Sequence, residues 1–148
     1  MRTVEQPFTV IVTNWETHAA ALYAVRRQVF VEEQQVPEDL EQDDFDPVSQ
    51  HVLALDQRDR PIGTGRLLPD GHIGRLAVLQ SWRGFGIGKA LMQRLLTLAS
   101  QQRFPAIELH AQVQALDFYA GLGFQVEGGE FMEAGIPHRT MRLTLPLE

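Results

Sequence analysis

The segment from Leu79 to Met92, LQSWRGFGIGKALM, constrains the fold of this chain more than any other. It places an arginine and three glycines between Arg83 and Gly88 and then continues directly into an apolar pattern typical of a helix. Glycine costs a helix interior roughly 1 kcal/mol relative to alanine. The first amides of a helix lack partners within it, and the helix dipole adds partial positive charge there. A strand that ends in this turn and opens a helix therefore predicts a phosphate-binding site.

Three known motifs use glycines in this way, and only one of them matches the segment. A P-loop requires G-x-x-x-x-G-K-[ST], but Lys89 is followed by Ala90 and the spacing differs. The dinucleotide-binding fingerprint G-x-G-x-x-G is matched only in part and normally follows a first strand. The pattern R-x-x-G-x-G is met in full by Arg83, Gly86 and Gly88.

The apolar and polar patterning predicts a single α/β domain over residues 1–148. Alternating and β-branched runs indicate strands and apolar stripes indicate helices, whereas the acidic residues 34–49 read as a loop. We expect strands at 8–13, 50–56, 61–69, 72–79, 105–111, 124–127 and 138–145, and helices at 16–33, 86–102 and 113–122. Asp70–Gly71 favours a hairpin turn. The strand–helix–strand order around the glycines predicts one parallel pair with a right-handed crossover. The fold class is therefore a mixed, mostly antiparallel sheet with helices on both faces.

Composition excludes several kinds of function. The 148 residues carry a formal net charge of -6, which disfavours nucleic acid as a main partner. The chain has no cysteine, so disulfides, thiolate metal sites and a cysteine nucleophile are excluded, and we expect no metal site. The opening MRTVEQPFTVIV lacks the pattern of a signal peptide, and no apolar run approaches the roughly 20 residues of a membrane span. We therefore expect a cytoplasmic protein that does not bind membranes.

The glycine segment and a second motif together resemble one enzyme family. RLAVLQSWRGFGIGKALM is similar to the acetyl-CoA motif of the GNAT superfamily of N-acetyltransferases, and QVQALDFYAGLGF to its downstream N-x-x-A-x-x-F-Y-x-x-L-G-F motif. The two occur in the family's order and its element order covers essentially the whole chain. VRRQVFVEEQQVP, DDFD, SQHVLAL and AGIPHRTM further resemble the small ElaA-type bacterial subgroup. The resemblance implies the GNAT acyltransferase fold and a homodimer is compatible with it.

The resemblance assigns the binding of coenzyme A to named positions. The backbone edge at the end of the 72–79 strand would pair with the pantetheine, as a peptide adds to a sheet, and the glycine turn would hold the pyrophosphate. Gln112 stands where the family has an asparagine that contacts the cofactor. The implied cofactor-binding residues are Leu76, Ala77, Val78, Arg83, Gly84, Phe85, Gly86, Ile87, Gly88, Lys89, Gln112 and Tyr119.

Direct acetyl transfer to an amine needs an oxyanion donor, an acid and a neutral amine. The resemblance assigns the oxyanion donor to the backbone amide near Val78 and the general acid to Tyr119. An amine with a pKa near 10.4 is mostly protonated at pH 7, so a base or a water relay is expected. The sequence leaves three candidate bases open, His110, His51 and Glu33.

The acceptor is the least constrained part of the prediction. We expect a primary amine of a small molecule or peptide, and the acidic residues 38–46 would attract such a cation. A catalytically silent CoA-binding sensor is the alternative. A minor alternative is an acyl-homoserine-lactone synthase, which the order of Arg26, Phe30, Asp43, Asp46 and Arg66 resembles. Those synthases lack the R-G-x-G-I-G turn.

Overall fold

The computed structural model describes residues 7–146, so the ends of the predicted domain, 1–6 and 147–148, lie outside the described residues. Within that range the strands are β1 (Phe8–Thr13), β2 (Gln50–Asp56), β3 (Pro61–Leu67), β4 (His72–Val78), β5 (Ala106–Gln112), β6 (Gln125–Glu133) and β7 (Ile136–Thr144). The α-helices are α1 (Trp15–Arg26), α2 (Glu38–Glu41), α3 (Ile87–Gln101) and α4 (Leu116–Ala120). Shorter turns are the π-helical η1 (Arg27–Glu33) and the 3-10 turns η2 (Asp46–Val48), η3 (Gln80–Trp82) and η4 (Val113–Ala115).

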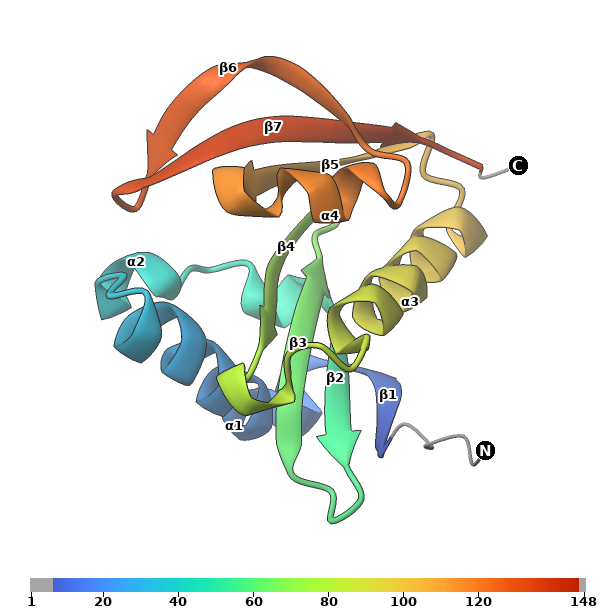
Figure 1. Ribbon diagram of the computed structural model, residues 1–148. Coiled ribbons are helices and arrows are strands. Elements are labelled where there is room, and N and C mark those ends of the chain that lie inside the picture. The colour runs from blue at the N-terminus through green and yellow to red at the C-terminus, as the bar shows by residue number, and fades with distance from the viewer. Residues whose placement is uncertain (1–6, 147–148) are drawn as a thin grey trace, which may run out of the picture.

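All seven strands form one sheet in the order β1-β2-β3-β4-β5-β7-β6. β4 and β5 are parallel, and the other neighbouring strands are antiparallel. The predicted fold class is therefore confirmed. Figure 1 shows β5 and β7 running across the direction of β2 to β4, so the sheet turns strongly at the parallel pair.

Four elements differ from the sequence prediction. The predicted helix 113–122 consists of the 3-10 turn η4 followed by the short helix α4. The first helix keeps its α geometry only to Arg26 and continues as η1, in which the Gln34 amide donates to Val29 O at 3.0 Å. The predicted acidic loop contains the short helices α2 and η2. The predicted strand 124–127 extends to Glu133 because a bulge around Gly128 lets the pairing with β7 resume at Phe131. A hydrophobic stripe is compatible with both α and π geometry, so the sequence could not separate them.

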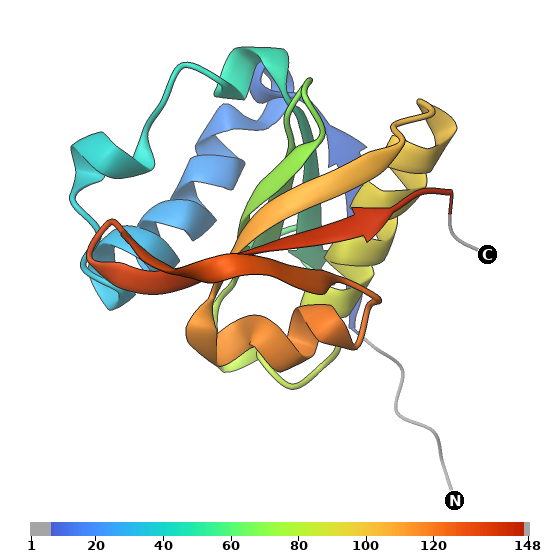
Figure 2. The same ribbon diagram turned by 90° about the horizontal axis from the view of Figure 1, so that it is seen from above.

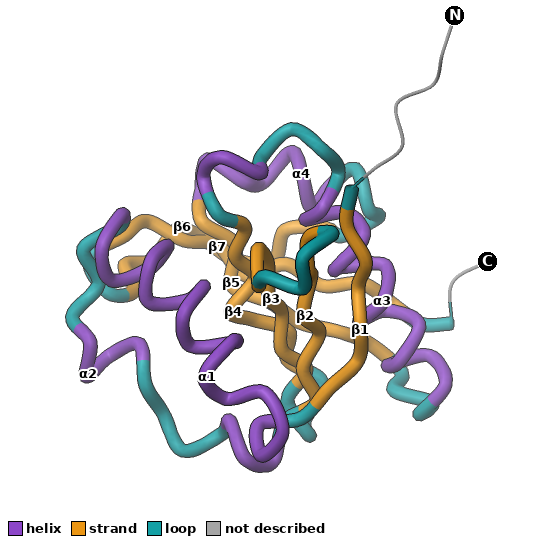
Figure 3. Tube along the Cα trace, turned by 90° about the horizontal axis from the view of Figure 1, so that it is seen from below, coloured by secondary structure: helices purple, strands orange, loops and turns teal. Residues whose placement is uncertain are grey.

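The helices cover both faces of the sheet, as the views from above and below show (Figures 2 and 3). α3 and α4 pack on one face over the main core, which includes Leu91 and Leu95 of α3 and Ile107 and Leu109 of β5. On the other face, α1 and η1 contact β4, where Val25 and Val29 pack on Ala77.

Two glycines of β3 let α3 lie close to the sheet. A Cβ on Gly63 would lie 3.0 Å from Leu91 Cδ1 and 3.1 Å from Ile87 Cγ2, and a Cβ on Gly65 would lie 2.8 Å from Leu95 Cδ1. Because core packing is already dense, larger side chains there would push the helix away. The two glycines of β3 thus allow the short distance between α3 and the sheet. The first turn of α3 begins within the glycine-rich residues 83–88.

A β-bulge in β4 redirects the strand next to β5. Thr64 pairs with Ala77 and Arg66 with Gly74, so Arg75 and Leu76 of β4 face a single residue of β3. Arg75 adopts φ 52°, the left-handed region. A bulge bends its strand and increases the local twist. The parallel pairing of β4 with β5 accordingly comprises only His72 with Glu108 and Ile73 with Leu109.

Candidate functional site

The backbone of β4 after the bulge forms an open edge, by which we mean residues 75–78 on the side that faces β5. Leu79 N donates to Ile62 O of β3 at 3.0 Å. Successive backbone groups of a strand point to opposite sides, so the amide and carbonyl of Val78 point toward β5. Ala77 lies opposite Thr64 of β3, and its side chain faces η1. The open edge can therefore accept an extended ligand between β4 and β5.

The glycine turn presents a row of unpaired amides at the end of this edge. Gly84 and Gly86 both adopt positive φ, 88° and 81°, and Gly86 caps α3. Within residues 7–146, the amides from Gly84 to Lys89 donate to no backbone or side-chain acceptor, and the first bond of the turn runs from Ala90 N to Gly86 O at 3.0 Å. Unpaired amides at a helix N-terminus fit a phosphate group.

Arg83 joins the open edge to the end of η1. Its Nε donates to Val78 O at 3.0 Å, and its two terminal nitrogens donate to the Glu33 carboxylate at 2.7 Å each. Hydrogen bonds from Arg83 lower the pKa of Glu33 below its ordinary value and raise the pKa of Arg83. Glu33 is therefore held as an anion, which makes it a weak proton acceptor while this pair persists.

The β5 side of the site is tied to the same helix end. Gln112, the last residue of β5, donates from Nε2 to Gln34 Oε1 at 2.9 Å. Gln112 is the position that replaces the expected asparagine. Two residues assigned to coenzyme A by the sequence, Arg83 and Gln112, thus bind to Glu33, the last residue of η1, and to its C-cap Gln34.

Tyr119 lies on α4, on the α3 side of the sheet. Its ring packs against Phe118 and Phe124, with centroid distances of 5.0 and 6.0 Å, and contacts the main core. Burial raises the pKa of Tyr119 to about 12, so its hydroxyl stays protonated at neutral pH. A protonated phenol can donate a proton, as an acid must. Phe118 also lies 3.5 Å from where a Cβ on Gly88 would stand, which brings α4 close to the glycine turn.

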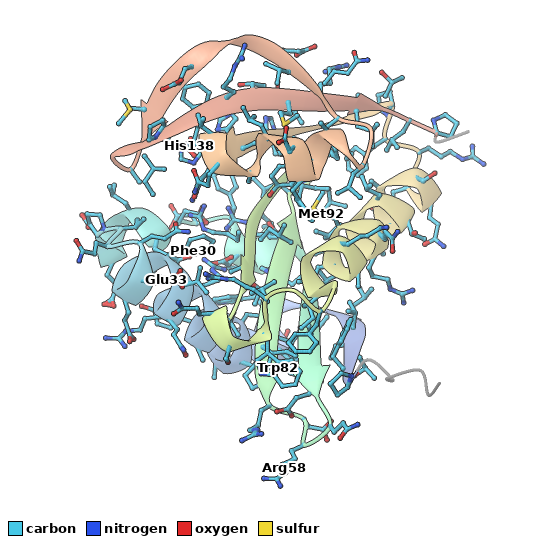
Figure 4. The ribbon with its side chains drawn as sticks, viewed as in Figure 1. Phe30, Glu33, Arg58, Trp82, Met92 and His138 are labelled. Atoms are coloured by element: carbon cyan, nitrogen blue, oxygen red, sulfur yellow. The ribbon has the colours of Figure 1, made fainter. Side chains whose placement is uncertain are left out.

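His110 lies on β5 immediately after the last residue paired with β4. Its side chain is 39% exposed and its Nδ1 lies 2.9 Å from Glu133 Oε1 of β6. Phe131 packs edge-on against the ring with a centroid distance of 5.1 Å. His138, labelled in Figure 4 on β7, lies 3.7 Å from the other Glu133 oxygen through Nε2. Glu133 therefore lies between two histidines beside the point where the strands diverge.

His51 lies apart from this group. It is 1% exposed, and its Nε2 lies 2.9 Å from Asp46 O. Burial lowers its pKa, an effect that the nearby Asp46 only partly offsets. The sequence pattern grouped His51 with His110 and Glu33, but the structure brings only the latter two near the open edge.

Three carboxylates of the acidic segment are engaged inside the protein. Glu41 and Asp46 are 2% and 4% exposed and both bind Arg26, while Asp43 binds Arg66 and Arg75. Four ion pairs share residues and so form one network. They are Arg26–Glu41 at 2.8 Å, Arg26–Asp46 at 2.7 Å, Arg66–Asp46 at 3.0 Å and Arg75–Glu41 at 3.2 Å. Their role is to hold α1 and α2 on the sheet, and they are not free to attract a cation.

Sequence reasoning missed Glu133, Gln34 and Arg75. Glu133 follows residues that read as a break in the strand, and its partner His110 lies 23 residues earlier. Gln34 was treated as the first residue of a loop. Among residues 7–146, no group of three or more histidine or acidic side chains is arranged to hold a metal ion, and no helix is long and apolar enough to cross a membrane.

Comparison with known proteins identifies the relatives of this chain. Residues 13–145 match the family model described as the acetyltransferase (GNAT) domain. The uncharacterized N-acetyltransferase YjcF of Bacillus subtilis (strain 168) is 39% identical over 136 residues, covering 89% of this chain and 96% of that protein. A presumed N-acetyltransferase from Lactobacillus plantarum superposes with a TM-score of 0.85 at 32% identity, covering 94% and 99% of the two chains. Escherichia coli ElaA superposes with a TM-score of 0.79 at 27% identity, covering 90% and 98%.

A CoA-dependent acyl-homoserine lactone synthase, solved with SAM and isopentyl-CoA, also has this fold. Its TM-score is 0.78 at 17% identity, covering 94% of this chain and 84% of that one. At this identity the likeness concerns the fold alone. In this chain, Arg26, Asp43, Asp46 and Arg66 belong to one network of ion pairs.

Proposed function

Because the chain belongs to the GNAT acetyltransferase family, we propose that it transfers an acetyl group from acetyl-CoA directly to a primary amine of a small molecule or peptide. The observation that carries this proposal is the combination of an open β4 edge with a row of unpaired amides at its end. The edge suits the amide-rich pantetheine arm, and the amides of the glycine turn suit the pyrophosphate. Arg83 and Lys89 add positive charge beside that turn.

In the proposed reaction the Val78 amide faces the carbonyl oxygen on which negative charge develops. The amine nitrogen forms the new bond to the acyl carbon, and the carbon–sulfur bond breaks. The acceptor ammonium loses one proton to a base before its nitrogen attacks, and it loses a second proton as the amide forms. The Tyr119 hydroxyl gives a proton to the departing thiolate, and the second proton from the amine restores that hydroxyl. With its pKa raised to about 12, the Tyr119 hydroxyl carries its proton when the thiolate forms, and it gives that proton up only as negative charge develops on the sulfur.

Of the three candidate bases, His110 has the best support. It is exposed, adjacent to the divergence of β4 and β5, and oriented by Glu133. His51 is buried and bound to Asp46 O. Glu33 is ionised and paired with Arg83, which suits the binding of a cation better than the removal of its proton. A carboxylate that fixes one imidazole nitrogen leaves the other available to accept a proton.

The deciding experiment measures release of the CoA thiol from acetyl-CoA with a panel of amines. Polyamines, amino acids, aminoglycosides and small peptides cover the main classes of primary amine. Thiol release that depends on one class, with a matching acetylated product by mass spectrometry, supports the proposal. Tight CoA binding without turnover on any amine supports the sensor alternative instead. Release that requires S-adenosylmethionine supports the synthase alternative.

Two further expectations belong to this proposal. A cytoplasmic location fits the dependence on acetyl-CoA and the lack of cysteine. A homodimer fits the family resemblance, and sedimentation or light scattering of the purified chain measures it.

A further inference from the structure

Two consecutive residues at the end of η1 hold both sides of the open edge. The Glu33 carboxylate accepts both terminal nitrogens of Arg83 at 2.7 Å, and Arg83 follows the end of β4. Gln34 Oε1 accepts Nε2 of Gln112, the last residue of β5, at 2.9 Å. We call Glu33 and Gln34, with these bonds, the strap; Figure 4 labels Glu33 where η1 ends.

The strap has a fixed base and exchangeable contacts. At its base, Val29 packs with Ala77 of β4, and the Gln34 amide is bonded to Val29 O. At its end, the side chains of Glu33 and Arg83 are 35% and 42% exposed. Exposed ion pairs contribute little stability, so Arg83 can change partner without disturbing the packed base. Single π-helical turns of this kind occur frequently at functional sites.

Arg83 occupies a backbone carbonyl of the open edge with which the proposed acyl donor, acyl-CoA, would pair. Its Nε binds Val78 O, which points from the open edge toward β5. A guanidinium binds phosphate oxygens in the same paired geometry that it uses with a carboxylate. Glu33 and the donor's phosphates therefore compete for one guanidinium.

The place that the Arg83 guanidinium occupies suits a cation. The guanidinium lies between the Glu33 carboxylate and the Val78 carbonyl, and both accept hydrogen bonds from it. A protonated primary amine can donate to the Glu33 carboxylate, while the Val78 carbonyl is left to the pantetheine arm of the acyl-CoA. The chain's own arginine thus acts there as a stand-in for a cationic substrate.

We propose that acyl-CoA draws Arg83 away from Glu33 and that the exposed Glu33 carboxylate then binds the ammonium group of the acceptor. This inference rests on the proposed function and adds to it a residue that binds the acceptor. It also narrows the substrate class to amines that arrive protonated. An uncharged or anionic acceptor gains nothing from the Glu33 carboxylate.

The first test measures the affinity of the full chain for CoA by calorimetry. Glu33→Gln removes the competitor for Arg83 and is expected to bind CoA about two- to fivefold more tightly. Glu32→Gln is the matched control, because Glu32 is adjacent, carries the same charge and pairs with Arg27. It is expected to bind CoA as the unmodified chain does. Equal affinities for the two variants overturn the competition.

The second test uses steady-state kinetics with the amine that gives the fastest thiol release. Glu33→Gln is expected to raise the acceptor KM about tenfold and to leave kcat within about twofold, because a charge-assisted bond to the amine is lost. A large fall in kcat at an unchanged acceptor KM makes Glu33 a base and overturns the inference. A failure of the unmodified chain to bind CoA overturns the proposed function itself, and this inference with it.

Discussion

Arg26 and Asp46 form a buried ion pair that fastens the first helix to the sheet. Arg26 Nη1 lies 2.7 Å from Asp46 Oδ1, and the two side chains are 1% and 6% exposed. The same guanidinium binds Glu41 at 2.8 Å. Burial would raise the pKa of Asp46, but the hydrogen bonds and charges of Arg26 and Arg66 outweigh it and hold that pKa below its ordinary value.

Arg26→Leu is expected to destabilise the protein by about 3–5 kcal/mol, because it leaves two buried carboxylates without their common partner. Urea unfolding followed by circular dichroism measures the loss. Arg27→Gln is the control, since Arg27 is 51% exposed and pairs on the surface with Glu32, and it should cost about 1 kcal/mol or less. Similar losses for the two variants would contradict a structural role for the network.

Tyr119→Phe tests the proposed acid. Loss of the hydroxyl is expected to lower kcat by about 10²- to 10⁴-fold, because the thiolate then leaves without a proton, while CoA affinity and the unfolding midpoint stay close to those of the unmodified chain. Tyr23→Phe is the control, since the Tyr23 hydroxyl binds Glu38 at 2.8 Å on an exposed part of α1. A folded Tyr119→Phe enzyme with unchanged kcat would remove Tyr119 from the mechanism.

Gly63→Ala is expected to destabilise the fold by about 1–3 kcal/mol through overpacking against α3. The new methyl group would meet Leu91, Ile87 and Ala54 within 3.0 to 3.3 Å. Gly129→Ala is the control, because a Cβ there has no neighbour within 4 Å. Thermal unfolding of both variants makes the comparison, and an equal change in Tm would show that α3 can move away from β3 at no cost.

The stability of the protein should fall as pH drops below about 6.5, the unfolded pKa of histidine. Burial depresses the pKa of His51 in the folded state, so the unfolded chain binds more protons below that pH and unfolding is favoured. His51→Gln is expected to reduce the difference in unfolding free energy between pH 7.5 and 5.5.

His72→Gln provides a contrast of opposite sign. Burial lowers the pKa of His72, but Asp70 and Glu108 outweigh that effect and raise it overall. The stabilisation from His72 is thus fully present below pH about 6.5 and is lost as pH rises through the higher folded pKa. Its removal should steepen the fall in stability between pH 7.5 and 5.5, and an equal pH profile for the two variants would contradict both assignments.

The elements that sequence predicts well are those whose signal is local. The alternation in 50–56 predicts a strand, and Asp70–Gly71 predicts a hairpin turn, without knowledge of distant partners. The glycine turn likewise predicts the start of α3. The acidic segment illustrates the opposite case. Its charges read as a solvated loop, because nothing nearby reveals that Glu41 is buried by Arg26, 15 residues earlier.

The candidate site depends still more on distant pairings. Arg83 and Glu33 are 50 residues apart, and Gln34 and Gln112 are 78 apart. Which side of β4 stays open follows from its register with β3 and from the bulge at Arg75, neither of which leaves a local pattern. The sequence therefore locates the glycine turn, whereas the contacts of Arg83 with Glu33 and of Gln112 with Gln34 are found only in the structure.

The positive φ of Arg75 at the β4 bulge affects both the stability of the sheet and the access to its open edge. Arg75 is held by Glu41 O at 2.7 Å and by Asp43 at 3.1 Å, so the bulge is anchored from outside the sheet. Without it, β4 could run alongside β5 and complete their ladder of hydrogen bonds. A continuous ladder would give a more stable sheet and would close the open edge at which we propose that acyl-CoA binds. The pairing of β4 with β5 therefore stays interrupted in the middle of the sheet. The contacts of Arg75 with Glu41 and Asp43 prevent the two strands from pairing further.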